Sequence, residues 1–124
     1  MTVNNPEAYL AGVWDWGILR GCFGETKIEP TDVDGLVERK GRFLLIEAKD
    51  SNADLKRGQR ITLEALHKTG VFTIVIVWGP TDCPERIELW TRKGRFNYES
   101  ADLAKLRDIV SQWFRWADSR GTYE

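Results

Sequence analysis

The hydrophobic and polar positions of the chain predict helices alternating with short strands. Asn5–Glu7 looks like a helix start, because it offers an N-cap, a proline at the first helical position and an acid in the first turn. Apolar residues then recur at roughly helical spacing as far as Leu19, and Gly21 ends the pattern. We therefore expect a first helix here, followed by a loop or short strand over 22–30.

Two extended runs, 32–38 and 43–49, follow on either side of Lys40-Gly41. Extended runs around a tight turn that contains glycine predict a β-hairpin. A polar loop at 50–54 then leads to a pattern typical of a helix over 57–68, with Gly70 as its stop.

The rest of the chain predicts a buried strand over 72–78, a turn over 79–84, a half-buried strand over 86–91 and a last helix capped by Ser100. The apolar positions expected to face inward on the two later helices are Ile61, Leu63, Leu66 and Ala65, then Leu103, Leu106, Ile109, Val110, Trp113 and Phe114. A parallel return after the second helix would make a mixed sheet flanked by helices, an α/β fold.

Composition narrows the class of protein. The chain has 124 residues, 42% of them hydrophobic and 30% charged, which fits one globular domain. Its start lacks the basic and apolar regions of a secretory signal, and no apolar run approaches a membrane span, so we expect a cytoplasmic protein. Cys22 and Cys83 do not make a disulfide scaffold, and with the lone His67 they fit no common zinc pattern.

The charge is unevenly distributed along the chain. The net charge is −1, but residues 35–62 carry 7 basic and 4 acidic side chains. This local excess surrounds the densest polar motif and includes Lys56, Arg57 and Arg60, which we interpret as candidate phosphate contacts. The alternative is an ordinary solvated face.

The hairpin carries the most informative chemistry. With the turn at Lys40-Gly41, Asp34 falls opposite Glu47 and Asp32 falls opposite Lys49, all on one face. Directly opposed side chains have Cβ atoms about 5 Å apart, so the two carboxylates repel unless a cation lies between them. Oxygen ligands favour Mg²⁺, Mn²⁺ or Ca²⁺. A register shift of one residue would separate the set.

Lys49 would lie beside such a metal, where it could orient a water or stabilise charge on a phosphate. A metal with a lysine is what phosphodiester hydrolysis requires. Asp34 and Glu47-Ala48-Lys49, at this spacing, resemble the motif of the PD-(D/E)XK nuclease superfamily. The flanking residues 28–35 and Gly58-Gln59-Arg60 resemble its Holliday-junction-resolvase-like and VRR-NUC-like branches, and small nucleases common in phages and prophages.

The resemblance covers residues 5–79 and implies a restriction-endonuclease-like core of order α-β-β-β-α-β. Residues 80–124, a further strand and helix, form an extension of the single nuclease-like domain, 1–124. The implied activity is Mg²⁺- or Mn²⁺-dependent endonuclease cleavage of DNA. DNA is the expected partner, with a homodimer or a protein partner as further candidates.

The resemblance also implies roles for individual residues. Asp34, Glu47 and the Ala48 carbonyl match the metal ligands, Lys49 matches the catalytic lysine, and Gln59 matches a helix glutamine that supports the site. The usual Pro-Asp dipeptide reads Pro30-Thr31-Asp32 here, so the choice of aspartate stays open. Spacing favours Asp34, with Asp32 behind the ligands, and Glu7 could match an acid on the first helix.

Other interpretations stay open. The acidic pair could be solvated hairpin charges, Lys49 could pair with Asp32, and Gln59 could be a helix-start residue. The fold could also serve as a catalytically silent module that binds nucleic acid or protein, or as an oligomer built on tryptophan-rich helices. For the tryptophans, we expect Trp14, Trp78, Trp90 and Trp113 in the core and Trp16 and Trp116 at the surface.

Overall fold

The computed structural model describes Glu7 and residues 11–121. The chain divides into two compact units, Met1–Asp32 and Val33–Glu124, which are described separately. The sequence-based prediction of one nuclease-like domain over 1–124 stays a prediction. Within the described residues, no helix is long and apolar enough to cross a membrane.

The first unit forms less helix than its apolar spacing predicts. Ala11 and Gly12 are helical, residues 13–15 are not, and a 3₁₀ helix, η1, spans Trp16–Leu19. The continuous helix to Leu19 is therefore wrong, because the Asp15 side chain accepts from Gly17 N at 2.9 Å and starts a separate turn. The helix start expected at Asn5 and Pro6 lies outside the described residues. Residues 22–30 form turns and loop without a strand.

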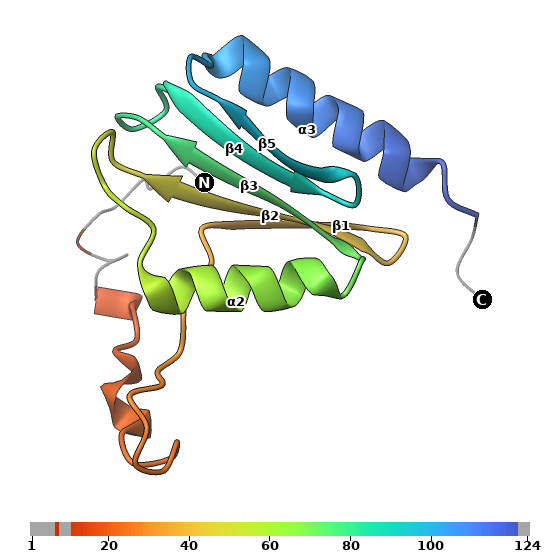
Figure 1. Ribbon diagram of the computed structural model, residues 1–124. Helices are drawn as coiled ribbons and strands as arrows, with labels where there is room; N and C mark the ends of the chain where they lie inside the picture. Colours follow the sequence, from red (N-terminus) through yellow and green to blue (C-terminus); the bar gives the residue numbers. More distant parts are fainter. Residues whose placement is uncertain (1–6, 8–10, 122–124) are drawn as a thin grey trace. The chain divides into compact units, whose positions relative to one another are not determined.

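The second unit is built on a five-stranded sheet of order β1-β2-β3-β4-β5 (Figure 1). The strands are β1 Gly35–Arg39, β2 Arg42–Lys49, β3 Phe72–Trp78, β4 Arg86–Thr91 and β5 Gly94–Tyr98. Helix α2, Arg57–Lys68, returns the chain so that β2 and β3 are parallel, while the other neighbours are antiparallel. The predicted α/β class and mixed sheet are confirmed; the restriction-endonuclease-like order is not, since no strand precedes β1 among the described residues.

The hairpin register follows from its turn. Lys40 and Gly41 both have positive φ, 52° and 77°, as a two-residue hairpin loop requires. The ladder runs from Arg39↔Arg42 to Gly35↔Ile46, which is the predicted register. It stops there, so the predicted strand start at residue 32 and the pairing of Asp32 with Lys49 are wrong.

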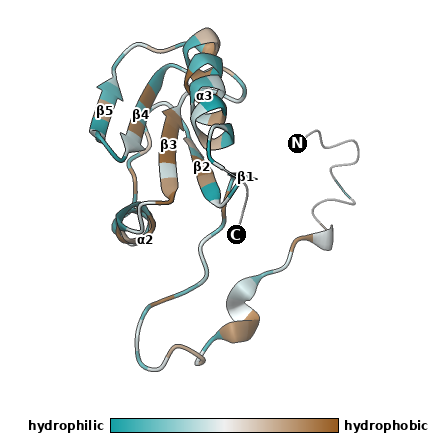
Figure 2. Cartoon of the chain, turned by 90° about the vertical axis from the view of Figure 1, so that its right-hand side faces the viewer, coloured by the Kyte–Doolittle hydropathy of each residue, from teal (hydrophilic) through white to brown (hydrophobic). Residues whose placement is uncertain are grey.

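Two apolar clusters lie on opposite faces of the sheet. Strand β3 contributes to both and is hydrophobic along most of its length (Figure 2). On one face α2 packs through Leu63 against a cluster that includes Leu45, Ile74, Ile76, Trp78 and Trp90. On the other face α3, Leu103–Asp118, packs through Ile109, Trp113 and Ala117 against a cluster that includes Leu44, Val75 and Ile87. β3 is apolar along almost its whole length because both of its faces are covered.

Some burial predictions are wrong. Trp14 is 67% exposed, and Ile61, Leu103 and Phe114 are also exposed. Ala65 is exposed too, whereas Ala117 is fully buried. Apolar spacing identifies a helical face, but the width of the face that meets the sheet depends on how the helix lies on it. The cap of α3 is Asp102, whose side chain accepts from Lys105 N, rather than Ser100.

Strand β5 was not predicted from the sequence. The turn before it is Arg92-Lys93, and Gly94, the first residue of β5, has φ 139°. The strand itself is short and polar at Arg95 and Asn97, and it lies at the edge of the sheet, so its hydrophobic signal is weak.

Candidate active site

A connected group of polar side chains lies where β2 ends beneath the start of α2. Glu47 and Lys49 point to the α2 side of the sheet, two residues apart on β2, and Gln59 comes from the first turn of α2. The Gln59 amide nitrogen donates to Glu47 Oε1 at 3.0 Å, and its oxygen accepts from Lys49 Nζ at 2.5 Å. Lys49 Nζ lies 3.8 Å from Glu47 Oε1.

Asp34 joins this group from the residue that directly precedes β1. Its Oδ2 accepts from Ala48 N at 2.9 Å, which closes the open end of the hairpin where the backbone ladder stops. The Asp34 carboxyl is also close enough to Glu47 for the two groups to interact electrostatically. The structure thus brings together the four residues predicted to be catalytic.

Glu47 has the most perturbed environment of the four. Burial raises the pKa of its carboxyl, the neighbouring Asp34 raises it further, and Lys49 and Gln59 oppose the rise. The resulting pKa is about 7, against 4.5 for an ordinary glutamate. Glu47 is buried and Asp34 is exposed beside it, and two carboxyls this close are costly to ionise together unless a cation is added.

The donor set fits a hard divalent cation. Asp34 and Glu47 supply carboxylate oxygens, and Ala48 supplies a carbonyl on the same edge of β2 as its N–H, where β1 no longer covers it. No group of three or more His, Cys, Asp or Glu side chains suited to a metal occurs among the described residues. Such an ion would therefore complete its shell with water or phosphate oxygens, as Mg²⁺ usually does.

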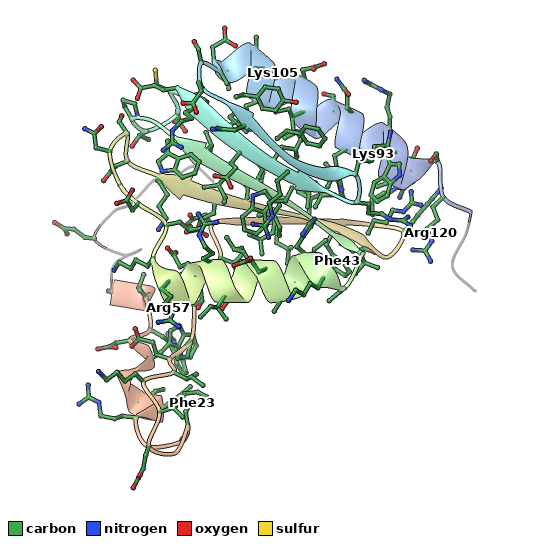
Figure 3. The ribbon with its side chains drawn as sticks, in the orientation of Figure 1. Phe23, Phe43, Arg57, Lys93, Lys105 and Arg120 are labelled. Atoms are coloured by element: carbon green, nitrogen blue, oxygen red, sulfur yellow. The ribbon has the colours of Figure 1, made fainter. Side chains whose placement is uncertain are left out.

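The start of α2 carries three basic side chains close in sequence to Gln59. Lys56 and Arg57 are exposed at the start of α2, and Arg60 lies half-buried with its guanidinium 5.9 Å from the Trp90 ring centroid (Arg57 is labelled in Figure 3). All three belong to the turn that carries Gln59. Their contact with DNA stays a prediction.

One further cation, Arg86, was missed by the sequence reasoning. The register places Lys49, Trp78 and Arg86 in one row across β2, β3 and β4, so all three point to the α2 side. The Arg86 guanidinium lies 3.7 Å from the Trp78 ring centroid. The signal was available only through the sheet order, because Trp78 is 29 positions and Arg86 is 37 positions after Lys49 in the sequence, and no local pattern links them.

Trp78 also holds the loop that connects the two halves of the site. Its indole N–H donates to the Ala53 carbonyl at 2.7 Å, and Gly79 N donates to the Lys49 carbonyl at 3.0 Å. These bonds fix the segment between Lys49 on β2 and Gln59 on α2. Trp78 is therefore buried as predicted, and it positions the site as well.

Two predicted supporting residues fall in the other unit. Glu7 and Asp32 both belong to Met1–Asp32, and both are exposed. Their support of the acidic pair stays a prediction. Cys22 and Cys83 are free and exposed.

Comparisons of the chain with protein-family models, with curated proteins and with solved structures found no match. The interpretation of the site therefore depends on its own residues and geometry.

Proposed function

We propose that the protein is a metal-dependent endonuclease that hydrolyses DNA phosphodiester bonds, of the PD-(D/E)XK kind with a restriction-endonuclease-like core. The observation that carries this proposal is the convergence of Asp34, Glu47, Lys49 and Gln59. Gln59 is hydrogen-bonded to both Glu47 and Lys49, and Asp34 accepts from the adjacent Ala48 N and raises the pKa of Glu47. A cytoplasmic location, in a phage or prophage setting, belongs to the same proposal.

The acidic pair supports the metal part of the proposal. Asp34, Glu47 and the Ala48 carbonyl would hold Mg²⁺ or Mn²⁺, which would polarise a phosphate oxygen and lower the pKa of a water. Without a cation, burial and the neighbouring Asp34 keep Glu47 partly protonated near neutral pH. A cation between the carboxyls would remove that cost, so binding is expected to release a proton.

Lys49 supports the hydrolytic part. Its side chain is 15% exposed, and its ammonium is oriented by Gln59, so the ammonium lies beside the acidic pair in a fixed direction. There it can orient the attacking water and stabilise the negative charge that grows on the phosphate. The water oxygen forms a bond to phosphorus, the phosphodiester P–O bond breaks, and the leaving oxygen takes up a proton.

Two variants test the proposal, Glu47→Ala and Lys49→Ala. We expect both to lose cleavage of DNA in Mg²⁺ or Mn²⁺ while keeping a cooperative unfolding transition. Calorimetric titration with Mn²⁺ should show binding to the wild type and to Lys49→Ala, but not to Glu47→Ala, because of the two substituted residues only Glu47 supplies a metal ligand.

Lys68→Ala provides the matched control, because Lys68 is an exposed lysine at the far end of α2. It should cleave like the wild type. Full activity in both site variants would overturn the proposal. DNA binding without cleavage in any metal would instead favour a catalytically silent binding module.

A further inference from the structure

A pocket of about 550 Å³ lies on the α3 side of the sheet, on the opposite face from Glu47 and Gln59. Its walls come from β3, β4, the β4–β5 turn, β5 and one face of α3. Volumes of this size are usual for sites that hold a small organic ligand. The proposed nuclease site makes no use of this pocket.

The charged groups of the pocket are all cations. Arg92, Lys93 and Lys105 line it, and no Asp or Glu is among the lining residues. Both acids of α3 have partners, since Asp118 pairs with Arg39 and Lys40, and Asp108 accepts from Gln112, which lines the pocket. Lys93 and Lys105 are labelled in Figure 3, toward opposite ends of α3.

Positive charge is concentrated at the end of the pocket near Trp116. Arg42 donates to the Trp116 carbonyl at 2.6 Å and lies 3.8 Å from its ring centroid. Burial lowers the pKa of Arg42, and repulsion from Arg120 and Arg92 lowers it further. An anion bound at this end would offset that repulsion.

The remaining wall is aromatic and includes a buried donor without a partner. Tyr98, Trp113 and Trp116 line the pocket. Trp113 is 6% exposed, and its indole N–H is buried without an acceptor among the described residues. Buried polar groups in proteins normally have a partner, so an acceptor atom on a bound molecule would complete this wall.

The shape of the pocket follows α3. Its lining positions on the helix run from Lys105 to Trp116 at the spacing of one helical face, which corresponds to about 16 Å along the axis. The ligand that fits is elongated, anionic at one end, and flat, with acceptor atoms on the flat part.

We propose that this pocket binds a nucleotide, either free or at the end of a nucleic-acid strand, with its phosphate against Arg92 and Lys93 and its base among the aromatic side chains. A phosphate offers several acceptors to the two cations, and a base offers a ring face together with an acceptor for Trp113. Glu47 and its neighbours take no part in this binding.

The test follows the indole N–H signals of isotope-labelled full-length protein by NMR in the presence of EDTA. Deoxyadenosine monophosphate should shift the signals of Trp113 and Trp116. The signals of Trp78 and Trp90 should stay in place, because their N–H groups donate to Ala53 and Glu88 on the other side of the sheet. Trp113→Phe and the other single tryptophan variants assign the signals.

The double variant with Arg92→Ala and Lys93→Ala should weaken nucleotide binding by about tenfold or more. Both positions are exposed in the β4–β5 turn, so the fold is expected to tolerate them. The control is the double variant with Lys68→Ala and Arg107→Ala. It removes the same charge at exposed positions outside the pocket and should leave nucleotide binding unchanged. Glu47→Gln should also bind normally, which separates this site from the proposed nuclease.

Deoxyadenosine and inorganic phosphate should each bind much more weakly than the nucleotide. A short oligonucleotide with a terminal phosphate distinguishes a free nucleotide from the end of a nucleic-acid strand as the ligand. It binds more tightly than the mononucleotide only if the pocket holds a strand end. Absence of a Trp113 shift, an equal loss in the control variant, or equal binding of inorganic phosphate would overturn the proposal.

Discussion

At the scale of single residues, the environment of Glu47 determines which chemistry the hairpin can support. The residue is 6% exposed, and Asp34 lies beside its carboxyl, yet Lys49 and Gln59 supply only partial compensation. A group with these surroundings costs stability when ionised, and functional sites are where proteins commonly keep such groups. The first two predictions concern the stability cost of ionising Glu47 and the Gln59 contacts that offset this cost.

The first prediction concerns pH and stability in the absence of metal. Folding raises the pKa of Glu47 from 4.5 to about 7, so the native state favours the protonated carboxyl. The contribution of Glu47 to the free energy of unfolding is therefore fully present below pH 4.5 and is lost as the pH rises to about 7. At about 1.4 kcal/mol for each pKa unit, this loss is about 3 kcal/mol.

Glu47→Gln should lack this pH dependence, because an amide does not titrate. Urea unfolding in EDTA, from about pH 4 to about pH 8, should show the variant more stable than the wild type at the upper end only. A difference between the two proteins that does not vary with pH would contradict the pKa and its cause.

The second prediction concerns Gln59, which donates to Glu47 and accepts from Lys49. Gln59→Ala should lower DNA cleavage by about 10–100-fold, since residues that orient ligands usually carry effects of this size. Steady-state cleavage rates in Mn²⁺ provide the measurement. Thr62→Ala, at an exposed position one turn further along α2, is the control and should cleave like the wild type.

At the scale of elements, the connection between β3 and β4 stabilises the end of the sheet where Lys49 lies. Gly79 follows β3, and its N–H donates to the Lys49 carbonyl. It has φ 155°, and a Cβ at this position would overlap the backbone carbonyl of Cys83. Any side chain here must displace that turn and, with it, the end of β2.

The third prediction follows from this packing. Gly79→Ala should lower the free energy of unfolding by about 3 kcal/mol or more, because backbone atoms cannot move aside like a flexible side chain. Gly58→Ala is the matched control: it lies in α2 with no atom within 4 Å of an added Cβ. It should be neutral or more stable by up to about 1 kcal/mol. Urea unfolding of both variants tests the pair.

The elements also show what the sequence can and cannot predict. Lys40-Gly41 fixes the register by itself, so the meeting of Asp34 with Glu47 could be predicted from the turn. The bond between Asp34 and Ala48 N could not, because it depends on where the ladder stops. Likewise Arg86 joins the site only through the order of strands, which local pattern does not define.

The wrong predictions of burial and of a continuous first helix have a common physical origin. Apolar periodicity placed Trp14 and Ile61 in a core, but burial requires a partner surface, and both are exposed. In the first unit the capping bond of Asp15 to Gly17 N interrupts a pattern that spacing alone reads as continuous. Helix α2 and strand β3 were predicted with the right bounds because stop signals and apolar runs agree there.

At the scale of the whole molecule, both apolar clusters and all four central site residues lie in Val33–Glu124. This unit contains the complete sheet together with α2 and α3. The fourth prediction is that a protein starting at Val33 folds cooperatively, with a midpoint of thermal unfolding within roughly 5 °C of that of the full chain, a shift that corresponds to about 1 kcal/mol.

The protein that starts at Val33 also tests whether the first unit supplies a metal ligand. If Asp34, Glu47 and the Ala48 carbonyl are the protein's ligands, calorimetric titration should give the same Mn²⁺ affinity as the full chain. A large loss of affinity in a protein that still folds would assign a ligand to the first unit, with Asp32 and Glu7 as the acids to test. Asp32→Asn and Glu7→Gln in the full chain would then separate the two, because each removes one charge and leaves the size of the side chain unchanged.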